Sequence, residues 1–399
     1  MRIAYISYEY PPDTAVGGIA TYTFQIVQIM KKRGHDVEVF SGSIHRTVSE
    51  NIEGINVHRV LCTDRSIFNK VILPFFETRN NEREFDVIES PEFSADGLAI
   101  KLKYPGIPLV VKLHTPWFLI DEINNTYFSI LKKARFILSG IFRGRIYNFF
   151  WRERNTKTDQ DYLITMLADQ IHTPSISLGN IISTKWNIPR NIIHLLPNPY
   201  IPKNDLLSIP INSETNTITY IGRLEIRKGL VALSKAVRIV LKKRPTVKFR
   251  FVGSIHNSPI MGMDMKTYLL KVLENNQESI EFLQVSSEDI YDIYAQTDIC
   301  VFPSIWENFP NTCLEAMSAG RGIVASKNGG MKDMLEDSKC GILINALKPS
   351  EIANALILLL DNKDLRQKMA ENARKKILAS YNQETIGQLI EQRYKEVIH

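Results

Sequence analysis

The sequence predicts an α/β protein with two doubly wound parallel sheets, each in its own domain. Three observations predict this class. The chain has 399 residues, which is long for one hydrophobic core and suits two. Short apolar strand patterns alternate with helical patterns, which is the βαβ rhythm of parallel sheets. That rhythm stops at a proline-rich stretch, LLPNPYIP at 195–202, and then starts again.

The first half opens with RIAYIS at 2–7, which we interpret as a strand. It has no long apolar core and no small-residue cleavage site, so it does not resemble a secretory leader. A loop with Gly17 and Gly18 follows, and the next residues show helical periodicity that ends at Gly34. We expect further strands at 36–40, 85–90 and 108–113, and helices at 19–34 and 94–103.

The second half repeats the alternation after the proline-rich stretch. We expect strands at 217–222, 247–253, 280–283, 298–304, 322–326 and 341–344, and helices at 229–243, 264–275, 287–296 and 311–320. The last part of the chain, 350–399, has a helical pattern. These elements predict two Rossmann-like domains, at 1–198 and 199–380.

Composition is that of a soluble globular protein, with 44% hydrophobic and 23% charged residues. No apolar run approaches the ~20 residues of a membrane span. The four cysteines form no CxxC pair, so we expect a reduced, cytoplasmic protein. The net charge of +6 tolerates an anionic substrate or membrane surface, and no nucleic-acid-binding module is evident.

Two cations follow the strand that ends in YIGRLEIRKG. Ligands of open α/β sheets bind beyond the carboxyl ends of the strands, and Arg223 and Lys228 lie just there. Arginine offers a planar fork of donors to phosphate, and lysine a point charge. These side chains are either a polyanion site or two solvated surface cations.

Two glutamates frame the end of another strand, in ENFPNTCLEAM at 307–317. Glu307 falls in the loop after the strand, because Pro310 disfavours helical backbone at Phe309. The helix then begins near Asn311 or Thr312, either of which could be its N-cap. Glu315 lies inside this helix, where it either contacts a ligand or only complements the helix dipole.

With these residues in view, the chain resembles the retaining glycosyltransferases of family four, which have the GT-B fold. Glu307 and Glu315 match their E-x7-E motif, and IGRLEIRKG, SKNGGMKDML, VVKLHTPW and LPNP match other segments in family order. The glycine loop and first helix, EYPPDTAVGGIATYTF, also match. The resemblance covers nearly the whole chain and is weakest over 121–160. It further implies that the C-terminal helix, 381–399, packs back on the first domain.

The resemblance implies a role for each matching residue. Glu315 would accept hydrogen bonds from the ribose hydroxyls of the nucleotide. Glu307 and His114 would contact the donor sugar, and Arg223 and Lys228 would hold its diphosphate. The backbone of Gly17 and Gly18 would approach the phosphates or the acceptor. The substrate-binding loop would comprise Asn308, Phe309, Pro310, Asn311 and Thr312. His114 alone, without the resemblance, could equally satisfy neighbouring backbone groups.

The predicted function is transfer of a sugar, from a UDP-sugar in our preferred assignment, to a glycan, glycolipid or lipid-linked acceptor with retention. No metal or cofactor is expected, because arginine and lysine can neutralise the departing diphosphate. The DQD triplet at 159–161 has a polar, basic upstream flank, so we interpret it as a solvated helix end and not as a metal motif. Retention could use Glu307 as a nucleophile or a front-face transfer, which we favour.

Two alternatives and one surface stay open. A sugar-nucleotide epimerase of the same fold is disfavoured by the E-x7-E pattern, and a catalytically silent binding partner by the intact cations and glutamates.

Residues 128–157 mix aromatic side chains with Lys132, Arg143 and Arg152 among other cations. They could bind an anionic membrane surface on the cytoplasmic face, or form a helical insertion with a solvated basic face.

Overall fold

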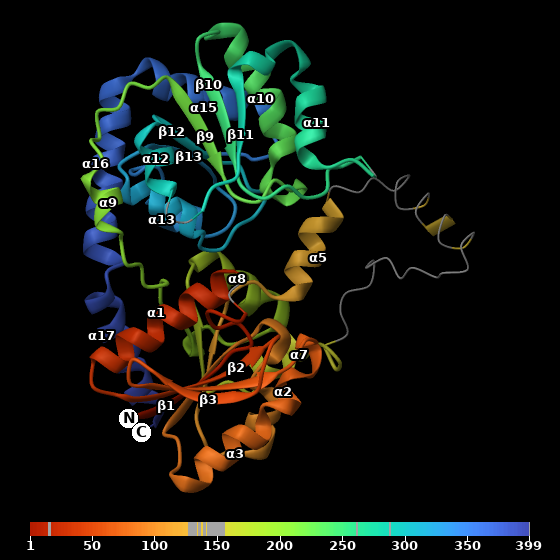
Figure 1. Cartoon of the computed structure of the whole chain (residues 1–399), viewed down its shortest axis with the longest axis vertical. Coiled ribbons are helices and arrows are strands. Elements are labelled where there is room, and N and C mark those ends of the chain that lie inside the picture. The colour runs from red at the N-terminus through yellow and green to blue at the C-terminus, as the bar shows by residue number, and fades with distance from the viewer. Residues whose placement is uncertain are drawn as a thin grey trace. The chain divides into compact units, whose positions relative to one another are not determined.

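The computed structural model describes residues 1–14, 17–126, 134, 137–138, 141, 156–260, 262–286 and 289–398. The chain forms two compact units (Figure 1). Unit 1 comprises Met1–Pro199 and Tyr381–His399, and unit 2 comprises Tyr200–Ser380. The basic aromatic segment predicted over 128–157 lies almost entirely outside the described residues.

Unit 1 is built on an eight-stranded sheet with the order β3-β4-β2-β1-β5-β6-β7-β8. Its strands are β1 Arg2–Ile6, β2 Asp36–Ser43, β3 Val48–Ile52, β4 Ile55–Leu61, β5 Val87–Pro91, β6 Leu109–Lys112, β7 Gln170–Thr173 and β8 Ile193–Leu195. All pairs are parallel except β3 with β4. The carboxyl ends of β1, β5 and β6 therefore meet at one edge, which positions the residues that follow these strands.

The antiparallel β3–β4 hairpin is an element that sequence patterns did not predict. Its turn holds Glu53 at φ 52° and Gly54 at φ 79°. Two consecutive positive φ angles give the turn twist that matches two antiparallel strands. Glycine adopts this conformation at no steric cost, whereas glutamate is an uncommon choice.

The helices of unit 1 are α1 Gly18–Lys32, α2 Phe68–Val71, α3 Leu73–Glu82, α4 Leu98–Lys103, α5 Trp117–Thr126, α7 Gln160–Met166, α8 Ile176–Trp186 and α17 Gln383–Ile398. The C-terminal helix α17 packs on α1, and its Ile386, Ile390 and Tyr394 join the core beneath β1 and β2. Arg33, which follows α1, contacts Glu391 of α17 at 2.6 Å. None of the helices that the structure describes has the length and apolarity to cross a membrane.

Unit 2 is built on a six-stranded, fully parallel sheet with the order β11-β10-β9-β12-β13-β14. Its strands are β9 Thr217–Ile221, β10 Lys248–Val252, β11 Ile280–Leu283, β12 Ile299–Phe302, β13 Gly322–Ser326 and β14 Ile342–Ile344. Strands β9, β12 and β13 are short and fully buried because both faces of a parallel sheet are covered by helices.

The helices of unit 2 are α9 Asn204–Ser208, α10 Leu230–Lys243, α11 Met265–Val272, α12 Ile290–Ala295, α13 Asn311–Ser318, α14 Met331–Met334, α15 Pro349–Asp361 and α16 Lys363–Ser380. Helices α10, α11 and α15 share one core with alternate residues of β9, β10 and β12. Helix α13 packs against α9 and α16. Since β9 and β12 are neighbours and parallel, the loops after them leave the sheet at the same edge.

Candidate active site

Lys228 and Glu307 follow the two neighbouring strands of unit 2 and form an ion pair. Lys228 ends the 3-10 turn η4 (Ile226–Lys228) beyond β9, and Glu307 lies in the loop between β12 and α13. Their side chains are 15% and 17% exposed, and the Ser304 hydroxyl also donates to Glu307, at 3.4 Å. The sheet thus brings an acid and a base that are 79 residues apart into direct contact.

The electrostatics of this pair favour an ionised Glu307. Burial alone would raise the pKa of its carboxyl group. Lys228, Arg227 and Arg223 more than offset that effect, and the pKa of Glu307 lies below its ordinary value. Glu307 therefore stays negatively charged at neutral pH, inside a cluster of three cations.

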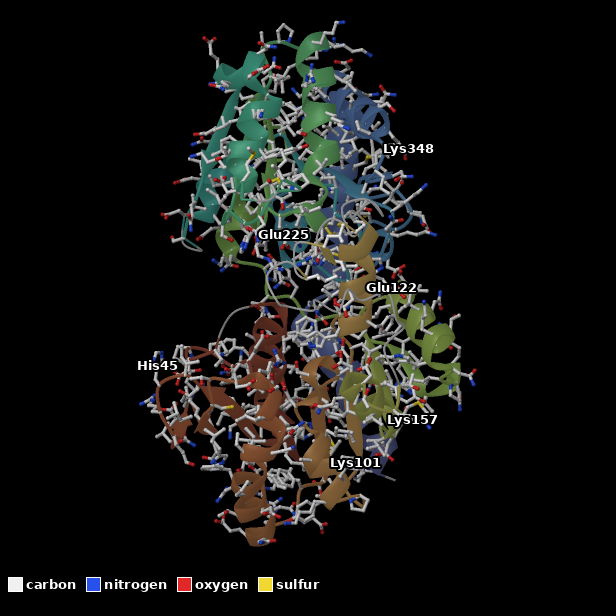
Figure 2. The ribbon with its side chains drawn as sticks, turned by 90° about the vertical axis from the view of Figure 1, so that its right-hand side faces the viewer. His45, Lys101, Glu122, Lys157, Glu225 and Lys348 are labelled. Carbon is white, nitrogen blue, oxygen red and sulfur yellow. The ribbon has the colours of Figure 1, made fainter. Side chains whose placement is uncertain are left out.

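Arg223 and Arg227 share one further acid. Nη2 of Arg227 lies 3.0 Å from Glu225 Oε1, and Nη2 of Arg223 lies 3.4 Å from the same oxygen. Glu225 is labelled in Figure 2. The Arg223 side chain is 53% exposed, so it can turn toward a ligand. Sequence reasoning named Arg223 and Lys228 but missed Arg227 and Glu225, although both lie in the quoted fragment RLEIRKG.

Two glycines fix the backbone around the pair. Gly229 has φ 76°, and a Cβ there would lie 1.8 Å from the Pro303 carbonyl oxygen. Gly329 has φ 91°, and its Cβ would lie 2.0 Å from the Glu307 carbonyl oxygen. The Gly330 N–H donates to that same oxygen at 2.9 Å. Only glycine permits both the dihedral angle and the close approach, so neighbouring backbone segments hold Glu307 in place.

The start of α13 differs in one detail from the prediction. The helix begins at Asn311, but its N-cap is Pro310 and not Asn311 or Thr312. Proline suits this place because its fixed φ, here −74°, allows the extended backbone of an N-cap. Proline has no side-chain acceptor, so the N-cap residue itself does not cap the first N–H groups. The preceding Asn308 and Phe309 are buried.

Glu315 lies one turn into α13 and contacts a different partner. The Tyr294 hydroxyl, on α12, donates to Glu315 Oε2 at 3.0 Å and to the Thr312 carbonyl oxygen at 3.0 Å. Burial raises the pKa of Glu315 despite the hydrogen bond from Tyr294 and the charge of Lys203. The two glutamates of the motif thus have opposite pKa shifts, because three cations surround only Glu307.

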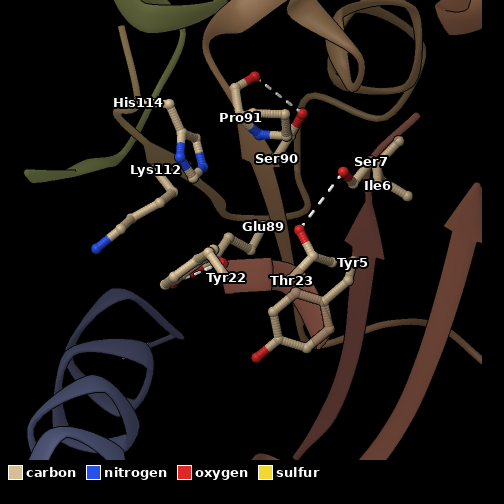
Figure 3. Close-up of a pocket in the computed structure, with 10 residues that line it drawn as sticks. All are labelled: Tyr5, Ile6, Ser7, Tyr22, Thr23, Glu89, Ser90, Pro91, Lys112 and His114. Carbon is tan, nitrogen blue, oxygen red and sulfur yellow. Dashed lines mark hydrogen bonds between the residues drawn. The ribbon is translucent and has the colours of Figure 1, made fainter. Parts of the chain in front are cut away.

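His114 lies just beyond β6 in unit 1. Its backbone N–H donates to both carboxylate oxygens of Glu92 at 2.8 Å. The imidazole meets the Tyr22 ring edge-on, with centroids 5.4 Å apart (Figure 3). Burial, together with the charges of Lys112 and Arg65, lowers the pKa of His114 well below its ordinary value. The imidazole is therefore neutral at pH 7 and can donate or accept one hydrogen bond.

The DQD triplet forms a helix start, but it is not solvated as we predicted. Asp159 is the N-cap of α7, and both Asp159 and Asp161 are buried. Asp161 accepts from the backbone N–H of Ser94 at 2.9 Å and of Trp117 at 2.8 Å. The carboxylate is thus used to hold the loops after β5 and β6. Sequence flanks describe only local polarity, so they could not reveal these long-range backbone donors.

Gly17 and Gly18 form the start of α1. Gly17 is the N-cap, with extended backbone at φ −162°, and as a glycine it supplies no side-chain cap. Within the part of the chain that the structure describes, a Cβ on Gly18 would meet no heavy atom within 4 Å. The predicted approach of these glycines to a ligand stays a prediction.

A buried polar cluster beside His114 was missed by the sequence analysis. Glu89 accepts from Tyr22 at 3.0 Å and from Tyr394 at 2.5 Å. Lys112 donates to the Leu196 carbonyl oxygen at 2.7 Å, and burial lowers the pKa of Lys112 to about 7. The cluster borders a cavity of about 10 Å³, room for about one water molecule (Figure 3). The feature of the sequence that could have indicated this buried polar cluster is a lysine inside the apolar strand VVKL.

Comparisons with known proteins agree with this architecture. Residues 16–203 match the family model described as Glycosyltransferase Family 4. Residues 204–376 match the model described as Glycosyl transferases group 1. An uncharacterised glycosyltransferase of Methanocaldococcus jannaschii is 25% identical over 99% of this chain and 98% of its own length.

Two solved structures share the fold over their whole length. Sucrose-phosphate synthase from Thermosynechococcus elongatus superposes with a TM-score of 0.72 and 17% identity, covering 100% of this chain and 99% of that one. The Anabaena protein HepE in complex with UDP superposes with a TM-score of 0.66 and 16% identity, covering 99% of this chain and 100% of that one. The predicted GT-B fold class is therefore confirmed.

Proposed function

We propose that this chain is a glycosyltransferase of the family 4, GT-B type, and that it transfers a sugar from a nucleotide-diphosphate donor with retention of configuration. The acceptor is a glycan or a lipid-linked glycan. In this proposal unit 2 binds the donor and unit 1 the acceptor. The transfer takes place on the cytoplasmic side of the membrane and uses no metal ion.

The observation that carries this proposal is the cation cluster around Glu307. Lys228, Arg227 and Arg223 follow the end of β9, and Glu307 follows the end of β12, the neighbouring strand in the sheet. Breaking a sugar–diphosphate bond leaves negative charge on the departing group and positive charge on the sugar ring. Fixed cations stabilise the first of these charges and a carboxylate the second, without reorganisation during the reaction.

The remaining predicted residues take supporting roles in the proposal. Glu315 accepts hydrogen bonds from ribose hydroxyls, and the start of α13, after Pro310, offers N–H groups to an anion. Neutral His114 and the backbone of Gly17 and Gly18 act from unit 1. UDP is the nucleotide that we assign, and the UDP complex of the structurally similar HepE supports this choice.

A ligand panel and one double variant test the proposal. UDP-, GDP- and ADP-glucose are compared by thermal shift, since a ligand that binds the native state raises its stability. We expect the largest shift with the UDP-sugar. The variant Arg223→Ala/Lys228→Ala should lose UDP release in the presence of acceptor by about 10²–10³-fold, the scale of removing an electrostatic donor.

The control for this variant is Lys368→Ala/Lys375→Ala, which removes two exposed cations of α16. It should retain turnover. Wild-type rates in the double variant would overturn the proposal, as would activity that EDTA abolishes and manganese restores. An altered sugar nucleotide formed without acceptor would assign an epimerase, and binding without turnover a silent partner.

The mechanism of retention is tested separately. We propose front-face transfer, in which the leaving diphosphate assists the acceptor and no sugar is bound covalently to the chain. Mass spectrometry after reaction with a slow 2-fluoro donor analogue should show the unmodified chain. A glycosyl adduct on Glu307 would show a double displacement instead.

A further inference from the structure

A groove on the outer surface of unit 2 is lined by cations from two neighbouring helices. It has a volume of about 310 Å³ and lies between α10, α11 and the 3-10 turn η5 (Glu274–Ser279). Helices α10 and α11 are labelled side by side in Figure 1. The groove is lined by Lys235, Arg238, Tyr268, Lys271, Asn275 and Asn276. Its volume lies at the lower end of the range for small-molecule sites.

The charged residues of these two helices are all positive. Helix α10 (LVALSKAVRIVLKK) contains lysine and arginine, helix α11 (MKTYLLKV) contains lysine, and neither helix contains an acid. Lys235 and Arg238 are three residues apart and share one helix face. Among the described residues, no ion pair involves Lys235, Arg238 or Lys271. Glu274 is the one acid among the described residues that line the groove, so the cations of this lining exceed its negative charge.

The groove lies away from the candidate active site within unit 2. Helix α10 starts after β9 and ends before the parallel strand β10, so it runs from the carboxyl-end edge of the sheet to the amino-end edge, and Lys235 and Arg238 lie in its middle turns. Lys271 is close to the end of α11, and Asn275 follows it, before β11. Lys228 and Glu307 follow the carboxyl ends of their strands. A ligand in the groove would therefore not occupy the proposed donor site.

We propose that this groove binds a short acidic saccharide. Lysine and arginine neutralise carboxylate groups, and the Asn275 and Asn276 amides can hydrogen-bond hydroxyl groups. The half-buried Tyr268 ring offers an apolar surface to the C–H face of a sugar. Apart from this ring, the apolar lining is Val272, which is little surface for insertion into a lipid bilayer. This binding is independent of the transfer reaction.

Titration calorimetry on the full chain tests the proposal with hexagalacturonate as the probe and maltohexaose as its neutral counterpart. Hexagalacturonate should bind, and its affinity should fall as salt is raised. The variant Lys235→Glu/Arg238→Glu should weaken that binding at least tenfold. Lys368→Glu/Lys375→Glu on α16 changes the net charge equally and should leave it unchanged. All four side chains are exposed, so folding is retained.

Three results would overturn the proposal. One is equal binding of maltohexaose and hexagalacturonate, and another is an equal loss of affinity in both double variants, which would indicate non-specific charge attraction. The third is that the wild-type chain sediments with phosphatidylglycerol vesicles but does not bind hexagalacturonate, and that Lys235→Glu/Arg238→Glu abolishes the sedimentation. That result would assign the groove to a membrane surface. Because binding needs no turnover, none of these results bears on the proposed transferase activity.

Discussion

Replacing Gly329 by alanine tests how the candidate site is held together. The Cβ of Gly329→Ala would lie 2.0 Å from the Glu307 carbonyl oxygen, whereas real Cβ atoms stay beyond 3.0 Å. The Glu307 segment must therefore move by about 1 Å, and a misplacement of that size can reduce turnover about 10²-fold. Alanine at positive φ costs about 1–2 kcal/mol, and a lost hydrogen bond from Gly330 to Glu307 about 1 kcal/mol more.

The assays are denaturant unfolding and UDP release with acceptor, and Gly262→Ala is the matched control. Gly262 also has a positive φ, 78°, but a Cβ there would meet no heavy atom within 4 Å. We expect Gly262→Ala to cost about 1–2 kcal/mol from the dihedral angle alone and to leave turnover near wild type. Gly329→Ala should cost about 2–3 kcal/mol and lose turnover. Turnover within threefold of the control would refute the argument that backbone contact positions Glu307.

Three further predictions follow from buried groups. Burial raises the pKa of Glu92 to about 8. Between about pH 5 and pH 8 the carboxyl group of Glu92 is therefore protonated in the folded chain, whereas it is ionised in the unfolded chain. The stability of the wild type should fall as pH rises through this range. The melting temperature of Glu92→Gln minus that of the wild type should increase from about pH 5 to pH 8, because glutamine cannot ionise. A difference that does not change with pH would contradict the raised pKa of Glu92. Tyr394→Phe removes a hydrogen-bond donor to buried Glu89 and should lower the free energy of unfolding by about 1–3 kcal/mol. Tyr291 is partly exposed, so the control variant Tyr291→Phe should change this free energy by less than about 0.5 kcal/mol. Urea titration of both variants measures the two changes. Glu315→Ala should weaken UDP binding about tenfold, since hydrogen bonds to charged groups are worth about 1.5–3 kcal/mol; an unchanged thermal shift with UDP would remove Glu315 from the nucleotide site.

The fold class followed from sequence because parallel sheets leave a strong local signal. Buried strands such as β9 and β12 are short apolar runs between amphipathic helices. The β3–β4 hairpin was missed for an equally physical reason. β3 reads VSENI and alternates between partly and fully exposed residues, so it has no apolar run. Its turn places Glu53 where asparagine, aspartate or glycine is the usual signal.

The candidate site could be predicted only in part. Strand ends identified the positions of Lys228 and Glu307, since the direction of the strands determines which edge their loops share. Their direct ion pair depends on the strand order β9-β12, which local patterns do not encode. Glu89 and Tyr394 are 305 residues apart, and each looks locally like part of an apolar strand or an amphipathic helix. Their contact arises only from packing of α17 in unit 1.

The Lys228–Glu307 pair also bears on how a donor would bind. The two side chains neutralise each other in a partly buried setting, where an unpaired charge would be costly. A diphosphate that attracts Lys228 must compete with Glu307, and Arg227 remains nearby to offset the carboxylate. The donor would thus exchange one ion pair for another, and Glu307 would be released as a carboxylate that can face the developing positive charge of the sugar. Because the cations already surround Glu307, the donor would meet positive charge that is present before the reaction, which is the condition under which electrostatic stabilisation lowers a barrier most.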